Sequence, residues 1–151
     1  MGLVEKYLRY LRYEKNYSSH TEVSYFKDIS QFETFLADFC EGIALQDADG
    51  DMVRRWVVSL MEAGVSARSV GRKLSALKSF YRFLIKESVI GKSPLSKIVA
   101  PKMEKPIPSF VNTKEMDEVL DVASADGDDF SSFRNRVIIE LFYMTGVRRA
   151  E

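Results

Sequence analysis

The sequence has few residues of the kinds that form disulfides, metal sites or membrane spans. One cysteine, Cys40, excludes a disulfide within the chain, and one histidine, His20, excludes a metal site built from several imidazoles. No run of eighteen or more apolar residues is present, so no segment is predicted to cross a membrane. The first residues carry charges among their apolar positions and lack the uncharged core of a signal peptide. We therefore expect a cytoplasmic protein in which histidines form no metal site.

The formal net charge of the chain is zero, but the charges are distributed unevenly. Residues 66–106 carry a net charge of +8, whereas residues 1–40, 41–65 and 107–151 carry −1, −3 and −4. A local positive field of this size favours an anionic polymer as partner. A basic face that is simply exposed to solvent is the commoner cause of such a run, so charge alone does not decide between the two.

Apolar residues recur at helical spacing in five or six segments, and almost no segment alternates as a strand would. The spacing predicts a first helix over residues 2–14 and a fourth over residues 67–86. Ser19 followed by Glu22 fits a capping box at the start of the second helix. Five phenylalanines beside leucines are predicted to pack in the core: Phe26, Phe32, Phe35, Phe80 and Phe83.

Prolines and lysines gather between residues 91 and 107, which predicts an exposed, extended linker there. Residues 1–90 then form a self-sufficient unit of four helices. Residues 108–151 contain two further helices, which are too few to bury a core alone. We therefore expect this second part to be only the beginning of a larger domain.

The fourth predicted helix has two different faces. With about 100° of rotation per residue, leucines and aromatic residues fall on one side of this helix, and basic and small hydroxyl residues fall within about 40° of Arg68 on the other. The second set comprises Arg68, Arg72, Ser75, Ser79, Arg82 and Lys86.

No acidic residue lies between Arg68 and Lys86, although exposed helices usually pair opposite charges four residues apart. Like charges at this spacing destabilise a free helix, so we expect a group outside the helix to compensate them. Phosphates fit this role, because arginine binds two oxygens at once and serine lets the helix approach closely. We interpret the basic stripe as a nucleic-acid contact, and a solvent-exposed basic face remains the alternative.

Four segments together resemble the tyrosine recombinase (phage integrase) family, and most closely its Xer-type members. They are SSHTEVSYFKDISQFETFL, SARSVGRKLSALKSFYRFLI, SPLSKIVAPKMEKPIPSFVNTKEMDEVL and ELFYMTGVRRAE. The resemblance implies an all-α chain: a four-helix, SAM-like core-binding bundle, a linker, and the first helices of a truncated α+β catalytic domain. It also implies that the second and fourth helices lie against the major groove of duplex DNA, with Ser19, Thr21 and Lys27 as further contacts.

The resemblance further implies a catalytic tyrosine that attacks a DNA phosphodiester without ATP or metal, in a tetramer of protomers on DNA. The family's first catalytic arginine lies in the pattern Thr-Gly-aliphatic-Arg-x-x-Glu, which is matched here by residues 145–151. Arg148 is therefore the candidate catalytic arginine, and Glu151 is the candidate for orienting it. Gly146 is predicted to allow a sharp turn after the preceding helix.

The remaining residues of the family's active site, a lysine, a His-x-x-Arg motif and the nucleophilic tyrosine, have no match in this chain. Tyr143 precedes the arginine motif, whereas the family's nucleophile follows it, so we do not assign it this role. We expect an N-terminal fragment of a recombinase that binds DNA weakly and cleaves nothing. The alternatives are a complete, non-catalytic DNA-binding regulator and a helical module that binds an acidic protein.

Overall fold

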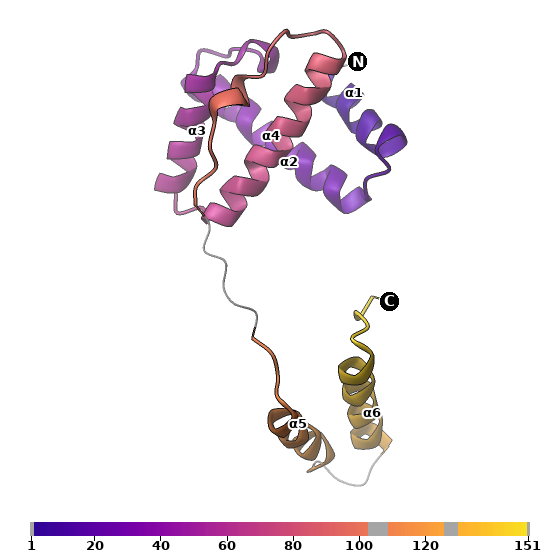
Figure 1. Cartoon of the computed structure of the whole chain (residues 1–151). Helices are drawn as coiled ribbons and strands as arrows, with labels where there is room; N and C mark the ends of the chain where they lie inside the picture. The colour runs from indigo at the N-terminus through magenta and orange to yellow at the C-terminus, as the bar shows by residue number, and fades with distance from the viewer. Residues whose placement is uncertain (1, 103–108, 126–129, 151) are drawn as a thin grey trace. The chain divides into compact units, whose positions relative to one another are not determined.

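The computed structural model describes residues 2–102, 109–125 and 130–150, and within these ranges every regular element is a helix. The predicted all-α fold is confirmed. The contacts divide the chain into two compact units, Met1–Glu104 and Lys105–Glu151 (Figure 1). In the described ranges, no helix combines the length and the apolar character that crossing a bilayer requires.

The first unit contains four main helices. They are α1 (Leu3–Arg9), which continues as a π-helical stretch over Tyr10–Glu14, α2 (Ser19–Phe39), α3 (Gly50–Glu62) and α4 (Ala67–Lys86). Two short 3₁₀ helices, η2 (Leu45–Asp47) and η3 (Pro94–Lys97), lie in the connections. Helices α2 and α4 pack against each other at the centre of the unit, and α1 and α3 flank them (Figure 1). The fourth helix has the bounds that its apolar spacing predicts.

Helix α4 buries more side chains than any other described helix, and aromatic residues join it to its neighbours. The ring of Tyr7 meets the ring of Phe80 edge-on at 5.3 Å, and Phe32 lies 5.0 Å from Trp56. Four of the five phenylalanines predicted for the core are buried there. Phe26 is not, because it lies one residue outside the apolar seam of α2, and 46% of its surface is exposed.

The N-terminal cap of α2 differs from the predicted one by a residue. Ser18, not Ser19, is the cap, and its hydroxyl accepts a hydrogen bond from the backbone N–H of Thr21 at 3.3 Å. The Glu22 carboxylate does not accept a hydrogen bond from the backbone N–H of the cap residue. Its carboxylate instead accepts two hydrogen bonds from the guanidinium of Arg12, at 2.8 and 3.0 Å. The predicted capping box is therefore wrong, because Arg12 offers Glu22 a bidentate, charge-assisted partner.

The segment after α4 folds back onto the first unit. Ser93 caps η3 by accepting a hydrogen bond from the N–H of Leu95, and η3 packs against α3 and α4. Leu95 and Ile98 are buried in the core, with 3% and 8% of their surfaces exposed. An exposed, extended linker is therefore the wrong description for residues 94–98. Residues 103–108 of the predicted linker lie outside the described residues, and the domain bounds 1–90, 91–107 and 108–151 stay a prediction.

The second unit contains α5 (Thr113–Ala125) and α6 (Phe130–Thr145), which pack against each other. Asn112 caps α5 in a reciprocal box: its side chain accepts from the N–H of Glu115, and the Glu115 carboxylate accepts from the N–H of Asn112. Large apolar side chains of α6 remain exposed, including Phe130 and Phe133 with 78% and 68% of their surfaces. Such exposure is expected of two helices that lack further layers to pack against.

Two buried tyrosines offer a matched test of the core. The Tyr81 hydroxyl donates a 2.7 Å hydrogen bond to the carbonyl of Leu45, whereas no hydrogen bond of ordinary geometry reaches the Tyr7 hydroxyl from the described residues. We expect Tyr81→Phe to lower the free energy of unfolding by about 1–3 kcal/mol, because it leaves a buried carbonyl unpaired. Tyr7→Phe should leave the stability unchanged or raise it. Urea unfolding followed by circular dichroism measures both, and equal losses would contradict this assignment.

Candidate nucleic-acid interface

The predicted basic stripe lies on the side of α4 that faces away from the core. Leu74, Leu77, Phe80, Tyr81 and Leu84 are buried on the opposite side, although Ile85 of the predicted apolar face is 40% exposed. The stripe comprises Arg68, Arg72, Ser75, Ser79, Arg82 and Lys86, and all of these are exposed except Ser79, which is half-buried. The helical spacing therefore predicted correctly which side of α4 is accessible to a partner.

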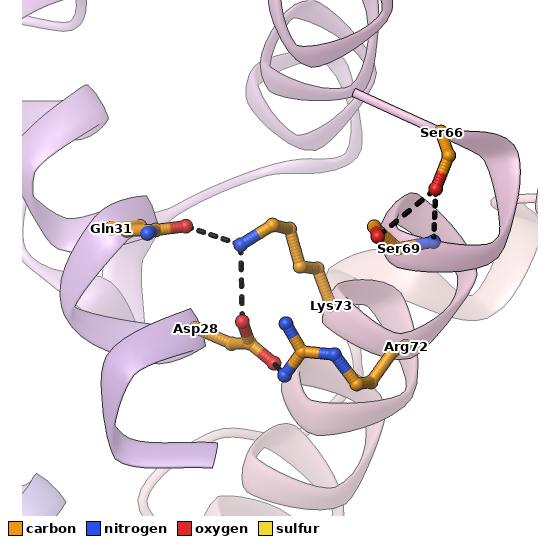
Figure 2. Close-up of polar contacts among 6 residues, drawn as sticks. All are labelled: Asp28, Gln31, Ser66, Ser69, Arg72 and Lys73. Carbon is orange, nitrogen blue, oxygen red and sulfur yellow. Dashed lines mark hydrogen bonds and ion pairs between the residues drawn. The ribbon is translucent and has the colours of Figure 1, made fainter. Parts of the chain in front are cut away.

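A buried carboxylate from α2 holds two neighbouring cations of α4 (Figure 2). One oxygen of Asp28 accepts from the Arg72 guanidinium at 2.5 Å, and the other accepts from the Lys73 ammonium at 3.1 Å. Lys73 also donates to the side-chain oxygen of Gln31. The side chains of Asp28 and Lys73 are 1% and 9% exposed, whereas 47% of the Arg72 side chain is exposed. The cluster therefore joins the core to the basic stripe.

The sequence contains signals for this cluster that the analysis of the stripe did not use. Asp28 lies between Tyr25 and Ile29, at a position that belongs to the apolar seam of α2. Lys73 lies about 140° around α4 from Arg68, which places it on the apolar side of that helix. A carboxylate and an ammonium on the apolar sides of two helices indicate a buried ion pair, because either charge alone would be costly to bury.

Lys86, at the last turn of α4, also has partners inside the protein. Its ammonium donates to the Glu14 carboxylate at 2.6 Å and lies 4.6 Å from the centre of the Tyr10 ring. The hydrogen bond to Glu14 raises the pKa of Lys86 above its ordinary value. The expectation that a group outside the protein compensates the whole stripe is therefore wrong for Arg72 and Lys86, because acids on other helices neutralise them.

Two arginines of the stripe remain unneutralised. Arg68 and Arg82 are exposed, and neither guanidinium group has a hydrogen bond or ion pair with any part of the chain that the structure describes. Ser75, which lies between them, donates its hydroxyl to the Gly71 carbonyl at 2.9 Å and so presents little bulk. Ser66 caps the start of α4 by accepting from the N–H of Ser69 (Figure 2). The exposed side of α4 thus carries free guanidinium groups separated by small residues, which suits the approach of a phosphate backbone.

The beginning of α2 contains the other three predicted contacts. Ser19 and Lys27 are exposed, and Thr21 is half-buried with its hydroxyl 3.0 Å from that of Ser18. Because Ser18 performs the capping, the Ser19 hydroxyl is not required for the start of the helix. The DNA contacts of Ser19, Thr21 and Lys27 stay a prediction.

The predicted turn at the end of α6 is confirmed. Gly146 has a φ of +63°, and its N–H donates to the Phe142 carbonyl at 2.9 Å. The Thr145 hydroxyl donates to the Leu141 carbonyl at 2.6 Å, so a side chain of the helix itself binds a carbonyl in its last turn. Arg148 follows this turn and is exposed. Glu151 lies outside the described residues, and the catalytic assignments of Arg148 and Glu151 stay predictions.

Two buried tyrosines of the first unit are poorly suited to nucleophilic attack. Burial raises the pKa of the Tyr7 hydroxyl, which the neighbouring Ser79 hydroxyl partly opposes, and burial likewise raises that of Tyr81. A phenol with a raised pKa is less often the phenolate that attacks a phosphorus atom. Tyr143 is about half exposed on α6, in the last turns before the arginine.

Comparison with known proteins matches this chain to one family. The model for "Phage integrase, N-terminal SAM-like domain" matches residues 4–88, which run from α1 to the end of α4. The tyrosine recombinase XerC of Bacillus subtilis (strain 168) is 38% identical over 99% of this chain, and that of Listeria innocua serovar 6a is 36% identical over 99%. The chain spans about half of these relatives, 48% and 49% of their lengths. No solved structure matches the chain.

Removal of the buried carboxylate tests its role in the first unit. We expect Asp28→Asn to lower the free energy of unfolding by about 3–5 kcal/mol, because the buried ammonium of Lys73 loses its counter-charge. Asp51→Asn is a matched control. Asp51 also contacts an arginine, Arg54, at 2.5 Å, but the two side chains are 79% and 57% exposed, so the expected loss is below about 1 kcal/mol. Equal losses in urea unfolding would contradict a structural role for the buried pair.

Proposed function

Because the chain belongs to the phage integrase (tyrosine recombinase) family, we propose that it is the DNA-binding N-terminal part of a Xer-like site-specific recombinase. The observation that carries this proposal is the exposed side of α4. The guanidinium groups of Arg68 and Arg82 have no partner in the described part of the chain, whereas Arg72 and Lys86 are paired with carboxylates of other helices. Free guanidinium groups on one side of a helix match the phosphates of a duplex.

In this proposal α4 lies along the major groove with its small serines nearest the DNA. Arg68 and Arg82 contact phosphates or base edges, and Ser75 leaves room for a close approach. Arg72 contributes through the N–H groups that Asp28 does not use, since a guanidinium has five donors. The first turns of α2 add phosphate contacts through Ser19, Thr21 and Lys27, where exposed backbone N–H groups also favour an anion.

The second unit contributes the first catalytic group. Arg148 stabilises the charge that develops on the non-bridging oxygens of the attacked phosphodiester, and Glu151 orients it. The nucleophilic tyrosine and the other catalytic residues come from sequence beyond this chain. In the whole protein four protomers assemble on DNA, cleave the strands through a phosphotyrosine and rejoin them. The chain by itself binds DNA and does not cleave it.

Charge removal from α4 tests the DNA-binding part of this proposal. We expect Arg68→Gln and Arg82→Gln each to weaken binding of the chain to a mixed-sequence duplex. Each should lower the slope of log K against log salt by about 1, because one phosphate contact is lost. Fluorescence anisotropy at several salt concentrations measures both quantities.

Lys6→Gln is the matched control for these variants. Lys6 is exposed on α1, and its ammonium group has no partner among the described residues. This change therefore removes the same charge from another helix. Its binding and salt slope should equal those of the unaltered chain. If Arg68→Gln and Arg82→Gln behave like Lys6→Gln, the proposal is wrong. Failure of the unaltered chain to bind any duplex at low salt would favour a protein-binding module.

The catalytic part is tested with nicked duplexes that trap a phosphotyrosine adduct. We expect no covalent adduct with this chain. If the reading frame continues past Glu151, its longer product should form one, and Arg148→Lys should slow that step about 100-fold, as expected for loss of a donor to the transition state. An adduct formed by the 151-residue chain itself would overturn the assignment of the nucleophile to later sequence. A frame that stops at this point would favour a non-catalytic DNA-binding regulator.

A further inference from the structure

The segment that follows α4 creates a second basic feature beside the stripe. After α4 the chain turns back and passes alongside α3 and α4 as η3 (Figure 1). Between η3 and the last turns of α4 lies an open hollow of about 320 Å³. It is lined by Lys78, Arg82, Ile85, Ser93, Leu95 and Ser96, and we call it the η3 hollow. Its lining contains two apolar side chains, two cations and two hydroxyl groups.

The two cations of the η3 hollow are not neutralised within the described residues. Lys78 and Arg82 lie four residues apart on α4. Neither charged side-chain group has an ion pair or hydrogen bond in the part of the chain that the structure describes. Like charges at this spacing destabilise a helix slightly, which is the expected cost of a site that an anion neutralises on binding. Lys92 and Lys97 line an adjoining hollow that shares Ser93 and Ser96, so the surrounding field is also positive.

The acidic residues closest to this region are occupied elsewhere. Asp49 and Asp51 line the adjoining hollow, not the η3 hollow itself. Asp49 caps α3 by accepting a 2.8 Å hydrogen bond from the N–H of Met52, and Asp51 pairs with Arg54 at 2.5 Å. Glu87, just after α4, lies about 180° around the helix from Lys78 and so faces away from the hollow. The lining of the η3 hollow therefore contains Lys78 and Arg82 and no carboxylate.

The hydroxyl groups give the site its chemical preference. The Ser96 side chain is exposed and has no partner among the described residues, so it can donate. The Ser93 oxygen accepts from the N–H of Leu95, which leaves its own O–H free to donate outward. Two cations and two hydroxyl donors around one opening can together donate to several oxygens of one phosphate.

We propose that the η3 hollow binds a backbone phosphate of the same duplex that α4 contacts, through Lys78, Arg82 and Ser96. The inference rests on the proposed function, because Arg82 belongs both to the stripe and to the hollow and so places the two on one continuous surface. The segment after α4 then contributes directly to DNA binding. Such a contact fixes the position of the duplex along α4 and does not read its sequence.

The experiment measures duplex binding by the 151-residue chain and three variants, Lys78→Gln, Ser96→Ala and Arg68→Gln, with Lys6→Gln as the matched control. Lys78 and Ser96 are exposed, so thermal unfolding should be unchanged. We expect Lys78→Gln to lower the salt slope by about 1, and Ser96→Ala to weaken binding without changing that slope. Both losses should be the same on two duplexes of unrelated sequence, since a phosphate contact is independent of the bases.

The outcomes separate this inference from the proposed function. If Arg68→Gln weakens binding while Lys78→Gln and Ser96→Ala match Lys6→Gln, the η3 hollow is not a contact and the proposed function stands. If Arg68→Gln also matches the control, the proposed function itself fails. A loss that differs between the two duplexes would assign Lys78 to base reading and overturn the phosphate assignment.

A further arm replaces chloride by inorganic phosphate at constant ionic strength. Unchanged duplex binding by the unaltered chain supports a site specific to the DNA backbone. A fall to the level of Lys78→Gln would show that free phosphate competes with the duplex for the hollow, which also supports the phosphate assignment. An equal fall in the Lys78→Gln variant would place the competition outside the hollow and count against the proposal.

Discussion

The Asp28 carboxylate links the two central helices of the first unit, and the accessible surface of α4 depends on that link. Asp28 is buried on α2 and contacts both Arg72 and Lys73 of α4. A lysine on the apolar side of α4 requires a counter-charge at that point, because an unpaired buried ammonium is costly. The pair therefore constrains the rotation and the register of α4 against α2. With this rotation, Arg68 and Arg82 are directed toward solvent.

The positive charge of residues 66–106 thus has two different roles. Part of it is structural, because Asp28 pairs with both Arg72 and Lys73, and Glu14 pairs with Lys86. These two carboxylates compensate two of the three positive charges. The side chains of Arg68, Lys78 and Arg82 have no partner within the described residues, and they are exposed on α4, with Lys78 and Arg82 beside η3. A partner of negative charge would therefore meet fewer free cations than the net charge suggests. They are, however, confined to one surface, where a duplex can contact several at once.

The second unit has a different physical character. Its two helices pack against each other but leave large apolar side chains such as Phe130, Phe133 and Leu141 exposed. The turn at the start of the arginine motif nonetheless forms, because Gly146 adopts its positive φ without strain. The motif is therefore formed locally by the end of α6. The catalytic role of Arg148, which follows this turn, stays a proposal.

Local patterns in the sequence were sufficient for the helices, for the bounds of α4, for the accessible side of that helix and for the turn after α6. These features depend on residues three or four apart, so the spacing of residues along the sequence is enough to predict them. The tertiary structure alone decided which cations are paired with a carboxylate and which are not, since Arg72 and Asp28 are 44 residues apart in the chain. It also decided that Leu95 and Ile98 complete the core, which the nearby prolines had concealed. Burial and ion pairing are properties of surfaces brought together by folding, and spacing along one helix cannot specify them.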